Sequence, residues 1–469
     1  MAIQQTIQFK SDHKYFAGFL QNLIDQSQIN ASVTMIGKTI ELIIDENDTN
    51  KLEDFSNTTN KYLPNSIFLG DIKTSNTQTK IIKERFLSPN YPIAPCQQCL
   101  EAICNPASDD YLNDSYSCTH YSNEIMKNSD FCSYSVHYSD GMTLLLTNAN
   151  KVNELFYLSE LEIKALFSIE KPSIKVTIKD ERLKEVVGGK NFIYIRTPYS
   201  IKSNIVALNA KESEIDYLFF DETDNKKCVI VKDNISFIRD NPLSKQLETL
   251  HKDNAINRVL NLEIEARFKG SIAANMSRKD GINFIVSNEI GIKRVLQFQE
   301  FDVEQLIANM QSDTLKSRML ENFKTKYPQA ILNLVNNKKA TLFEAIATIL
   351  ELDTTTFEGL SDKAYEFRGN GGVKIDMYFT DDGFDFVSLF GSIMSFKLAN
   401  TDTHFLAYSI FEAFGDMIIS TCNQLKTKFK IENFIMMGDM FENSVIYSRI
   451  LSKFQLQKPY FSSFIALDE

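Results

Sequence analysis

Three cysteines and one histidine in the first third of the chain have the spacing of a zinc knuckle. Two residues separate Cys96 from Cys99, and eighteen further residues separate this pair from Cys118 and His120. Two close ligand pairs separated by about twenty residues are typical of a tetrahedral zinc site, because each pair can hold two corners of one ion. A complete four-cysteine site would have its last thiolate at position 121, where this chain has Tyr121.

The sequence leaves the fourth ligand open. His120, Cys104 and Cys132 are all close enough in the chain to join the three cysteines, and three thiolates with one imidazole are an accepted donor set for zinc. The alternative is a decayed site, packed as an ordinary loop whose free thiols stay reduced in the cytosol. A metal bound here would be structural rather than catalytic.

A glycine turn near the end of the chain is a candidate nucleotide loop. Residues 438–443 lie between an expected strand, 432–437, and an expected helix, 444–454. Gly438 would let the backbone approach a phosphate, and the start of the helix would offer free N–H groups. Asp439 argues against this role, because a carboxylate repels phosphate unless a cation lies between them. The alternative is a plain helix-capping turn ending at Asn443.

Length, charge and composition indicate a globular protein of several domains. At 469 residues the chain is longer than one hydrophobic core usually serves, so about two to four domains are expected. The net charge of -11 argues against nucleic acid as a partner, because phosphate backbones attract clustered Lys and Arg. Neither a leader sequence nor about eighteen consecutive apolar residues can be found, so we expect a cytoplasmic protein that does not span a membrane.

The periodicity of apolar residues predicts a succession of mixed α/β units. Residues 1–75 should form a small α+β unit with helices near 15–26 and 50–61 and a strand at 39–44. Between 136 and 225, strands are expected at 142–146, 173–178, 192–196 and 205–208, with a helix over 151–167. From 226 onward, strands at 228–231 and 235–239 precede helices over 303–352 and a long helix at 405–429.

Several motifs, in the right order, resemble the HypF family of carbamoyltransferases, which mature nickel-iron hydrogenases. The stretch from Cys96 to Cys118 is similar to the first zinc knuckle of that family. The other matching motifs are Leu342–Ala347, Phe357–Gly359 and the loop Gly438–Asn443, joined by weaker matches at Glu170–Pro172 and Ser287–Gly291.

This resemblance implies a multidomain α+β and α/β architecture in four parts. Residues 1–75 would be a ferredoxin-like acylphosphatase domain, and 90–135 a zinc-knuckle-like segment. Residues 136–225 would be a remnant of a YrdC-like domain, and 226–469 a TsaD-like carbamoyltransferase domain of the actin fold (ASKHA).

In the family, these domains free carbamate from carbamoyl phosphate, make carbamoyl adenylate with ATP, and pass the carbamoyl group to the partner protein HypE. The resemblance thus implies zinc and ATP as cofactors and a HypE-like partner. It also assigns nucleotide binding to Gly438, Asn443 and Glu344, where Glu344 replaces an aspartate that contacts the ribose.

The chain departs from the family at its catalytic positions. The alignment puts Ala17 at the phosphate-binding arginine of the acylphosphatase and Met35 near its water-orienting asparagine, and no uncharged side chain replaces a bidentate arginine. The His-x-x-x-His pair of the last domain is missing from the sequence. Two functions remain open: carbamoyl transfer in hydrogenase maturation, and a non-catalytic scaffold that binds a nucleotide or a maturation partner.

Overall fold

The protein consists of two compact units, residues 1–237 and 238–469. The computed structural model describes residues 2–11, 13–77, 93–116, 118, 120, 132–222, 226–231, 234–239, 270–278, 281–367, 369, 371–380, 383–454 and 459–461. The two units are described separately.

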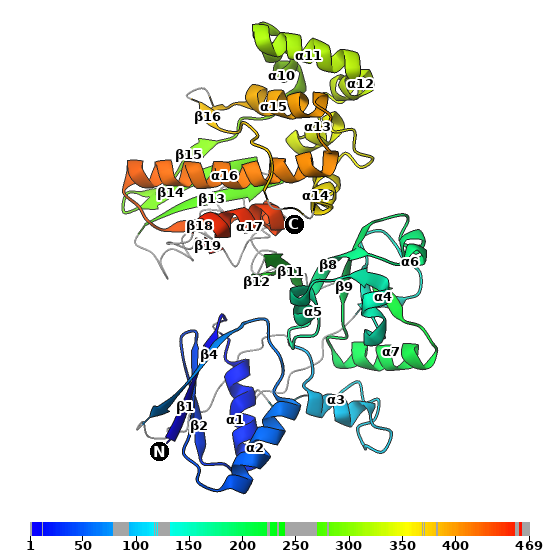
Figure 1. Ribbon diagram of the computed structural model, residues 1–469, viewed down its shortest axis with the longest axis vertical. Helices are drawn as coiled ribbons and strands as arrows, with labels where there is room; N and C mark the ends of the chain where they lie inside the picture. Colours follow the sequence, from blue (N-terminus) through cyan, green and yellow to red (C-terminus); the bar gives the residue numbers. More distant parts are fainter. Residues whose placement is uncertain are drawn as a thin grey trace. The chain divides into compact units, whose positions relative to one another are not determined.

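The first unit begins with a four-stranded antiparallel sheet in the order β2-β3-β1-β4. Its elements are β1 (Ala2–Phe9), α1 (Tyr15–Ser27), β2 (Ala31–Ile36), β3 (Thr39–Ile44), α2 (Thr49–Tyr62) and β4 (Leu69–Thr77). This order of strands and helices is the ferredoxin-like topology expected for residues 1–75. The two helices pack side by side on one face of the sheet (Figure 1).

The local sequence explains these elements. Alternating apolar residues of β3 turn Ile40 and Leu42 toward the helices, and Asp48 caps α2 by accepting a hydrogen bond from the Asn50 N–H. Phe16 of α1 stacks on Phe9 of β1 with ring centroids 5.3 Å apart. The core of this sheet is therefore aromatic and apolar.

A short segment with one helix, α3 (Gln97–Cys104), follows. Cys96, Cys99 and Cys118 belong to the same buried cluster as the residues of α1 and the first sheet. Residues 90–92, 117, 119 and 121–131 of the expected knuckle segment lie outside the described residues.

A mixed eight-stranded sheet completes the first unit, in the order β12-β11-β8-β9-β6-β10-β5, with β7 paired to β8. Its strands are β5 (Tyr134–Ser135), β6 (Thr143–Leu146), β7 (Phe156–Tyr157), β8 (Ser173–Ile178), β9 (Phe192–Arg196), β10 (Tyr217–Phe220), β11 (Lys226–Val231) and β12 (Asn234–Arg239). Its helices are η1 (Ala149–Lys151), α4 (Val152–Leu155), α5 (Glu160–Leu166), α6 (Glu181–Val186) and α7 (Ile201–Glu212).

Two expectations for this region are wrong. The helix expected over 151–167 is broken, because buried Phe156 enters the sheet as β7 and Ser159 starts a new helix with a capping box. The strand expected at 205–208 lies within α7, where a capping box between Ser200 and Ser203 begins the helix. The strands expected at 142–146, 173–178 and 192–196 are confirmed.

Because β11 pairs with β8, this sheet continues past residue 226, where the sequence predicted the start of the last domain. The four domain boundaries stay predictions.

The second unit contains a five-stranded sheet in the order β15-β14-β13-β18-β19. Three consecutive antiparallel strands lie on one side and two strands parallel to β13 on the other, as in one lobe of the actin fold. The strands are β13 (Ser271–Ser277), β14 (Gly281–Asn288), β15 (Gly291–Gln297), β18 (Phe434–Met437) and β19 (Tyr460–Phe461), and β16 (Phe379–Thr380) pairs separately with β17 (Gly383–Phe384).

Helices make up most of the rest of the second unit. They are α10 (Val303–Ser312), α11 (Thr314–Lys326), α12 (Pro328–Asn336), α13 (Leu342–Ile349), α14 (Phe357–Tyr365), α15 (Phe386–Leu398), α16 (Thr403–Phe429), η2 (Asp439–Glu442) and α17 (Ser444–Lys453). The long helix α16 lies across the sheet (Figure 1). It is long and apolar enough to cross a membrane, but 72% of its apolar window is buried in the protein. Such burial is typical of a core helix in a soluble protein.

One buried carboxylate joins the parts of the first unit. Glu170, 1% exposed, accepts hydrogen bonds from the Tyr15 hydroxyl of α1, from the Ser66 hydroxyl and, at 3.1 Å, from the Ile67 N–H. The backbone N–H of the neighbouring Ile169 donates to the Asn65 carbonyl, and the Ile169 carbonyl accepts a hydrogen bond from the Ala94 N–H. The chain just before β8 is thereby attached to both the first sheet and the knuckle segment.

We predict that Glu170→Ala lowers the melting temperature of the protein by roughly 5–10 °C. The change leaves the buried Ser66 and Tyr15 hydroxyls without their acceptor, which costs about 2–3 kcal/mol, and each kcal/mol shifts the melting of a unit this size by about 2–4 °C. Thermal melting followed by circular dichroism measures the shift. Glu185→Ala, an exposed position on α6, is the control and should shift melting by less than about 2 °C; equal shifts in the two variants would contradict the prediction.

Candidate functional site

The four predicted metal ligands come together at the start of α3. Cys96 is the N-cap residue of the helix and Cys99 lies in its first turn, so the helix holds both sulfurs on one side. Cys118 and His120 approach from the opposite end of the segment. The three sulfurs and the imidazole nitrogen all lie within 4.8 Å of one another.

The separations fit a tetrahedral ion of the size of zinc. The Cys96 sulfur lies 3.4 Å from that of Cys99 and 3.7 Å from that of Cys118. His120 Nδ1 lies 3.2, 3.3 and 3.9 Å from the sulfurs of Cys96, Cys99 and Cys118. Zinc at about 2.3 Å from sulfur and about 2.0–2.1 Å from nitrogen needs ligand separations of about 3.5–3.8 Å. Zinc binding stays a prediction, and the donor set matches it.

The geometry favours one of the three alternatives for the fourth ligand. Cys104 lies at the far end of α3, outside the cluster. The Cys132 sulfur lies 3.4 Å from the backbone oxygen of Asp221, beside the second sheet. Of the three, only His120 reaches the sulfurs of Cys96, Cys99 and Cys118.

The cluster is electrostatically prepared for a cation. Hydrogen bonds from Cys118 and Cys99 hold the pKa of the Cys96 thiol far below its usual range, and hydrogen bonds to Cys118 and Cys96 raise the pKa of His120 to about 10. Side-chain hydrogen bonds with Cys118 and Cys96 are the largest causes of the raised pKa of Cys99, and burial and charge repulsion from the same two sulfurs add to it. A divalent ion would relieve this repulsion and displace the shared protons. It would also cross-link the segment, a structural role.

The predicted nucleotide loop is closely packed, and its polar groups bind partners within the protein. Gly438 has φ of 99°, and a Cβ there would lie 2.2 Å from the carbonyl oxygen of Met276, so only glycine fits. The Asn443 side chain accepts hydrogen bonds from the N–H groups of Val445 and Ile446. The first N–H groups of α17, expected to be free for a phosphate, are therefore capped by the protein itself, and this expectation is wrong.

Glu344 is also engaged within its own element. Its carboxylate accepts a hydrogen bond from the Thr341 N–H at 2.7 Å, and its N–H bonds back to the Thr341 hydroxyl in a capping box. This contact stabilises the start of α13. The structure brings Gly438 and Asn443 into one loop and gives Glu344 a capping contact in a separate helix; nucleotide binding by the three stays a prediction.

Asp439 is not a free carboxylate facing a phosphate cradle. It is 3% exposed and accepts a hydrogen bond from the Arg278 N–H at 2.9 Å. Its other oxygen forms an ion pair with the Arg278 guanidinium, which also pairs with Glu358 at the start of α14. Burial lowers the pKa of Arg278, but the nearby acids, chiefly Asp439, raise it by more, so the pKa is raised overall. Sequence reasoning identified the unusual acid but not its distant partner.

In the first sheet, the two positions aligned with acylphosphatase residues are apolar and enclosed. Ala17 is fully buried in α1, and Met35 is 7% exposed in β2. Both belong to the core under the helices. A core alanine and methionine offer no hydrogen bond to a phosphate or to a water.

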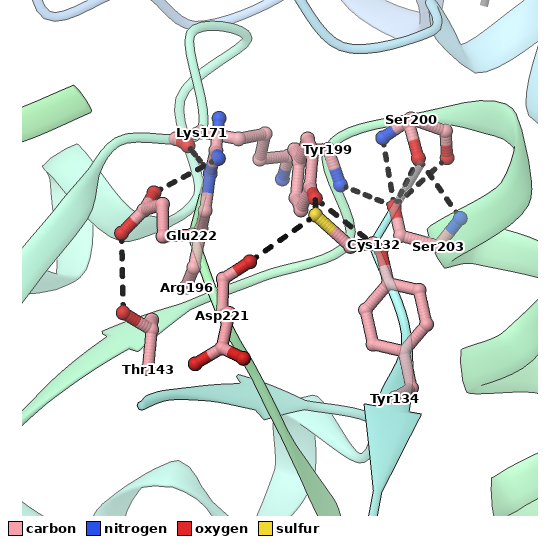
Figure 2. A network of polar contacts seen from close by, with 10 residues as sticks. All are labelled: Cys132, Tyr134, Thr143, Lys171, Arg196, Tyr199, Ser200, Ser203, Asp221 and Glu222. Atoms are coloured by element: carbon pink, nitrogen blue, oxygen red, sulfur yellow. Dashed lines mark hydrogen bonds and ion pairs between the residues drawn. The ribbon is translucent and has the colours of Figure 1, made fainter. Parts of the chain in front are cut away.

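A polar network in the second sheet escaped the sequence analysis. Figure 2 shows its centre, the fully buried Arg196 at the end of β9. Its guanidinium donates to the Lys171 carbonyl at 2.6 Å, pairs with Glu222 at 3.0 Å, and lies 3.6 Å from the Tyr199 ring centroid. The hydroxyl of Thr143 donates to the other Glu222 oxygen at 3.1 Å. These contacts occupy the guanidinium on three sides.

Lys171 has an unusual backbone in the same network. Its φ of 44° is in the left-handed region, which few non-glycine residues adopt, and its carbonyl is fixed by Arg196. Burial lowers the pKa of its ammonium group to about 8. One signal was available in the sequence: an arginine ending the apolar strand 192–196 must find partners for its charge when buried.

Comparisons with known proteins identify the fold. No model of a known protein family matches this sequence, and no curated protein matches it by sequence. Solved structures do match, and they show that the fold of this chain is HypF-like.

Two crystal structures illustrate the match. HypF of T. kodakarensis is 13% identical, with a TM-score of 0.58 over 100% of this chain and 97% of that one. Full-length HypF in its phosphate- and nucleotide-bound form is 11% identical, with a TM-score of 0.51 over 100% and 96%. At these identities the comparison shows the fold, and the HypF-like fold expected from the motifs is confirmed.

We predict that the purified protein contains about one zinc ion per chain and that Cys118→Ser removes most of it. Loss of one thiolate from a four-ligand site weakens binding strongly, since structural zinc contributes roughly 10–16 kcal/mol of apparent binding energy in small peptides. Elemental analysis of the purified proteins measures the content. The control is Cys104→Ser, which changes a cysteine at the end of α3 that lies outside the cluster. Wild-type protein without zinc, or full zinc in Cys118→Ser, would contradict the assignment.

Proposed function

We propose that this chain is a catalytically degenerate, cytoplasmic HypF-like protein that takes part in nickel-iron hydrogenase maturation by binding a HypE-like partner. The observation that carries the proposal is a HypF-like fold over the whole chain combined with apolar residues at the aligned acylphosphatase positions. Ala17 and Met35 are core residues, so the first catalytic step lacks its phosphate anchor. The chain thus combines a HypF-like fold with apolar residues at the two aligned acylphosphatase positions.

The metal cluster supports a scaffold role. Cys96, Cys99 and Cys118 share the core of the first sheet, so an ion bound there would stabilise the fold. His120 would complete a closed set of four ligands, and a closed set leaves no open position for a substrate. Zinc would thus be a structural cofactor.

A second candidate is retained nucleotide binding in the second unit, with ATP as the ligand. The nucleotide-bound form of one HypF structure favours it. The capped start of α17 and the Asp439 carboxylate argue against it. The scaffold reading is therefore preferred.

We predict that the protein does not cleave ATP to AMP and pyrophosphate in the presence of carbamoyl phosphate. This reaction needs a phosphate-binding arginine, and the aligned residue of this chain is the buried Ala17. Pyrophosphate release is measured with an enzyme-coupled assay, beside an active HypF as the positive control. Carbamoyl-phosphate-dependent AMP formation above the protein-free rate would show that an enzyme is present and would reject the degenerate reading.

We also predict that a HypE-like protein co-purifies with the tagged chain from its native cell. Mass spectrometry identifies the bound proteins, and a tagged, unrelated protein of similar charge serves as the control. Enrichment of a HypE-like protein over this control is the expected result. Failure to enrich any hydrogenase-maturation protein would remove the support for the proposed pathway while leaving the fold assignment unaffected.

A further inference from the structure

The second unit contains a carboxylate bound in the manner of a ligand. Both oxygens of Asp439 are held by one residue: the Arg278 N–H donates to Oδ1 at 2.9 Å, and the guanidinium of the same residue pairs with Oδ2. A backbone N–H and an arginine fork together are a common way of binding an oxyanion. Here the anion belongs to the protein.

The surroundings of Asp439 are buried and closely packed. Its side chain is 4% exposed, against 28% for that of Arg278. The residue before it, Gly438, lies so close to the Met276 carbonyl that a Cβ could not fit. The loop is therefore fixed against the end of β13, and the carboxylate has little freedom to leave its site.

A buried donor lies next to this loop. Asn275 of β13 is 2% exposed and is in register with Met437, the last residue of β18 before Gly438. Among the described residues, its Nδ2 has no hydrogen-bond acceptor. A buried amide without an acceptor is uncommon, and this one lies on the strand that pairs with the residues leading into the loop.

The carboxylate also connects three elements. Arg278 follows β13, Asp439 begins η2, and Glu358, which pairs with the same guanidinium, lies in the first turn of α14. Asn443 adds a second link, because its Nδ2 donates to the Ser361 hydroxyl of α14 at 2.9 Å. The charge of Asp439 thus contributes to closing the loop onto the helix.

We propose that Asp439 is an internal ligand: its carboxylate fills an oxyanion site formed by the N–H and guanidinium of Arg278 and excludes the phosphate groups of external ligands. Glu358 and Glu442 add negative charge around Arg278 and strengthen the exclusion. The class of ligand that the site would accept without Asp439 is a phosphate-type oxyanion. The inference rests on the geometry of the second unit and not on the proposed function.

The test compares pyrophosphate binding by the full-length protein and its variants. Asp439→Ala empties the site while leaving Arg278 in place. Glu442→Ala removes only a weaker charge from the same loop, so it should change pyrophosphate binding less than Asp439→Ala does. Thermal melting is followed with and without pyrophosphate, and binding is measured by calorimetry. Asp439→Ala should melt several degrees lower than the wild type, recover part of the loss in pyrophosphate, and bind pyrophosphate at least about tenfold more tightly.

Two further variants make the result decisive. Arg278→Met combined with Asp439→Ala should show no pyrophosphate effect, because the guanidinium that carries the positive charge of the site is gone. Asp439→Asn keeps the shape of the side chain if the alanine variant fails to fold, and it should melt lower than the wild type. Equal pyrophosphate binding by the wild type and Asp439→Ala, or a lower melting temperature with no gain in binding, would overturn the internal-ligand assignment. Neither result depends on carbamoyl transfer or on a HypE-like partner.

Discussion

The packing of the first unit depends on the hydrogen bonds to one buried side chain, because a polar group removed from water needs partners within the protein. Glu170 is almost completely buried, and its three donors come from α1 and from the chain before β4. Residue 169 adds backbone bonds to the knuckle segment. A single short stretch before β8 therefore defines how the ferredoxin-like sheet, the knuckle and the second sheet pack together. Replacing a buried, fully bonded carboxylate is costly, because its donors lose their partner as well.

Charged groups bound by partners from the same chain also occur elsewhere in the protein. Arg196 is enclosed by a carbonyl, a carboxylate and an aromatic ring, and Arg278 is shared between two acids. Arg196 connects the end of β9 to Lys171, and Arg278 connects the end of β13 to Asp439. At these strand ends, the charged groups of the chain are therefore bound by partners from the chain itself.

The sequence predicted local features well and distant ones poorly. Short spacing was enough to bring Cys96 and Cys99 onto one turn of α3, but the choice of His120 over two cysteines needed the path of the chain. The strand expected at 205–208 became helix because a capping box at Ser200 outweighed a run of apolar residues. The partner of Asp439 lies 161 residues away, a separation at which spacing carries no information.

The sulfurs of the knuckle belong to the same core as α1, and this has a consequence for biosynthesis. With zinc bound as proposed, the core of the first sheet would be complete only when the four ligands are fixed. The yield of correctly folded protein would then follow the supply of metal in the cell. Oxidation of the three cysteines would release the ion and loosen the packing of the first sheet.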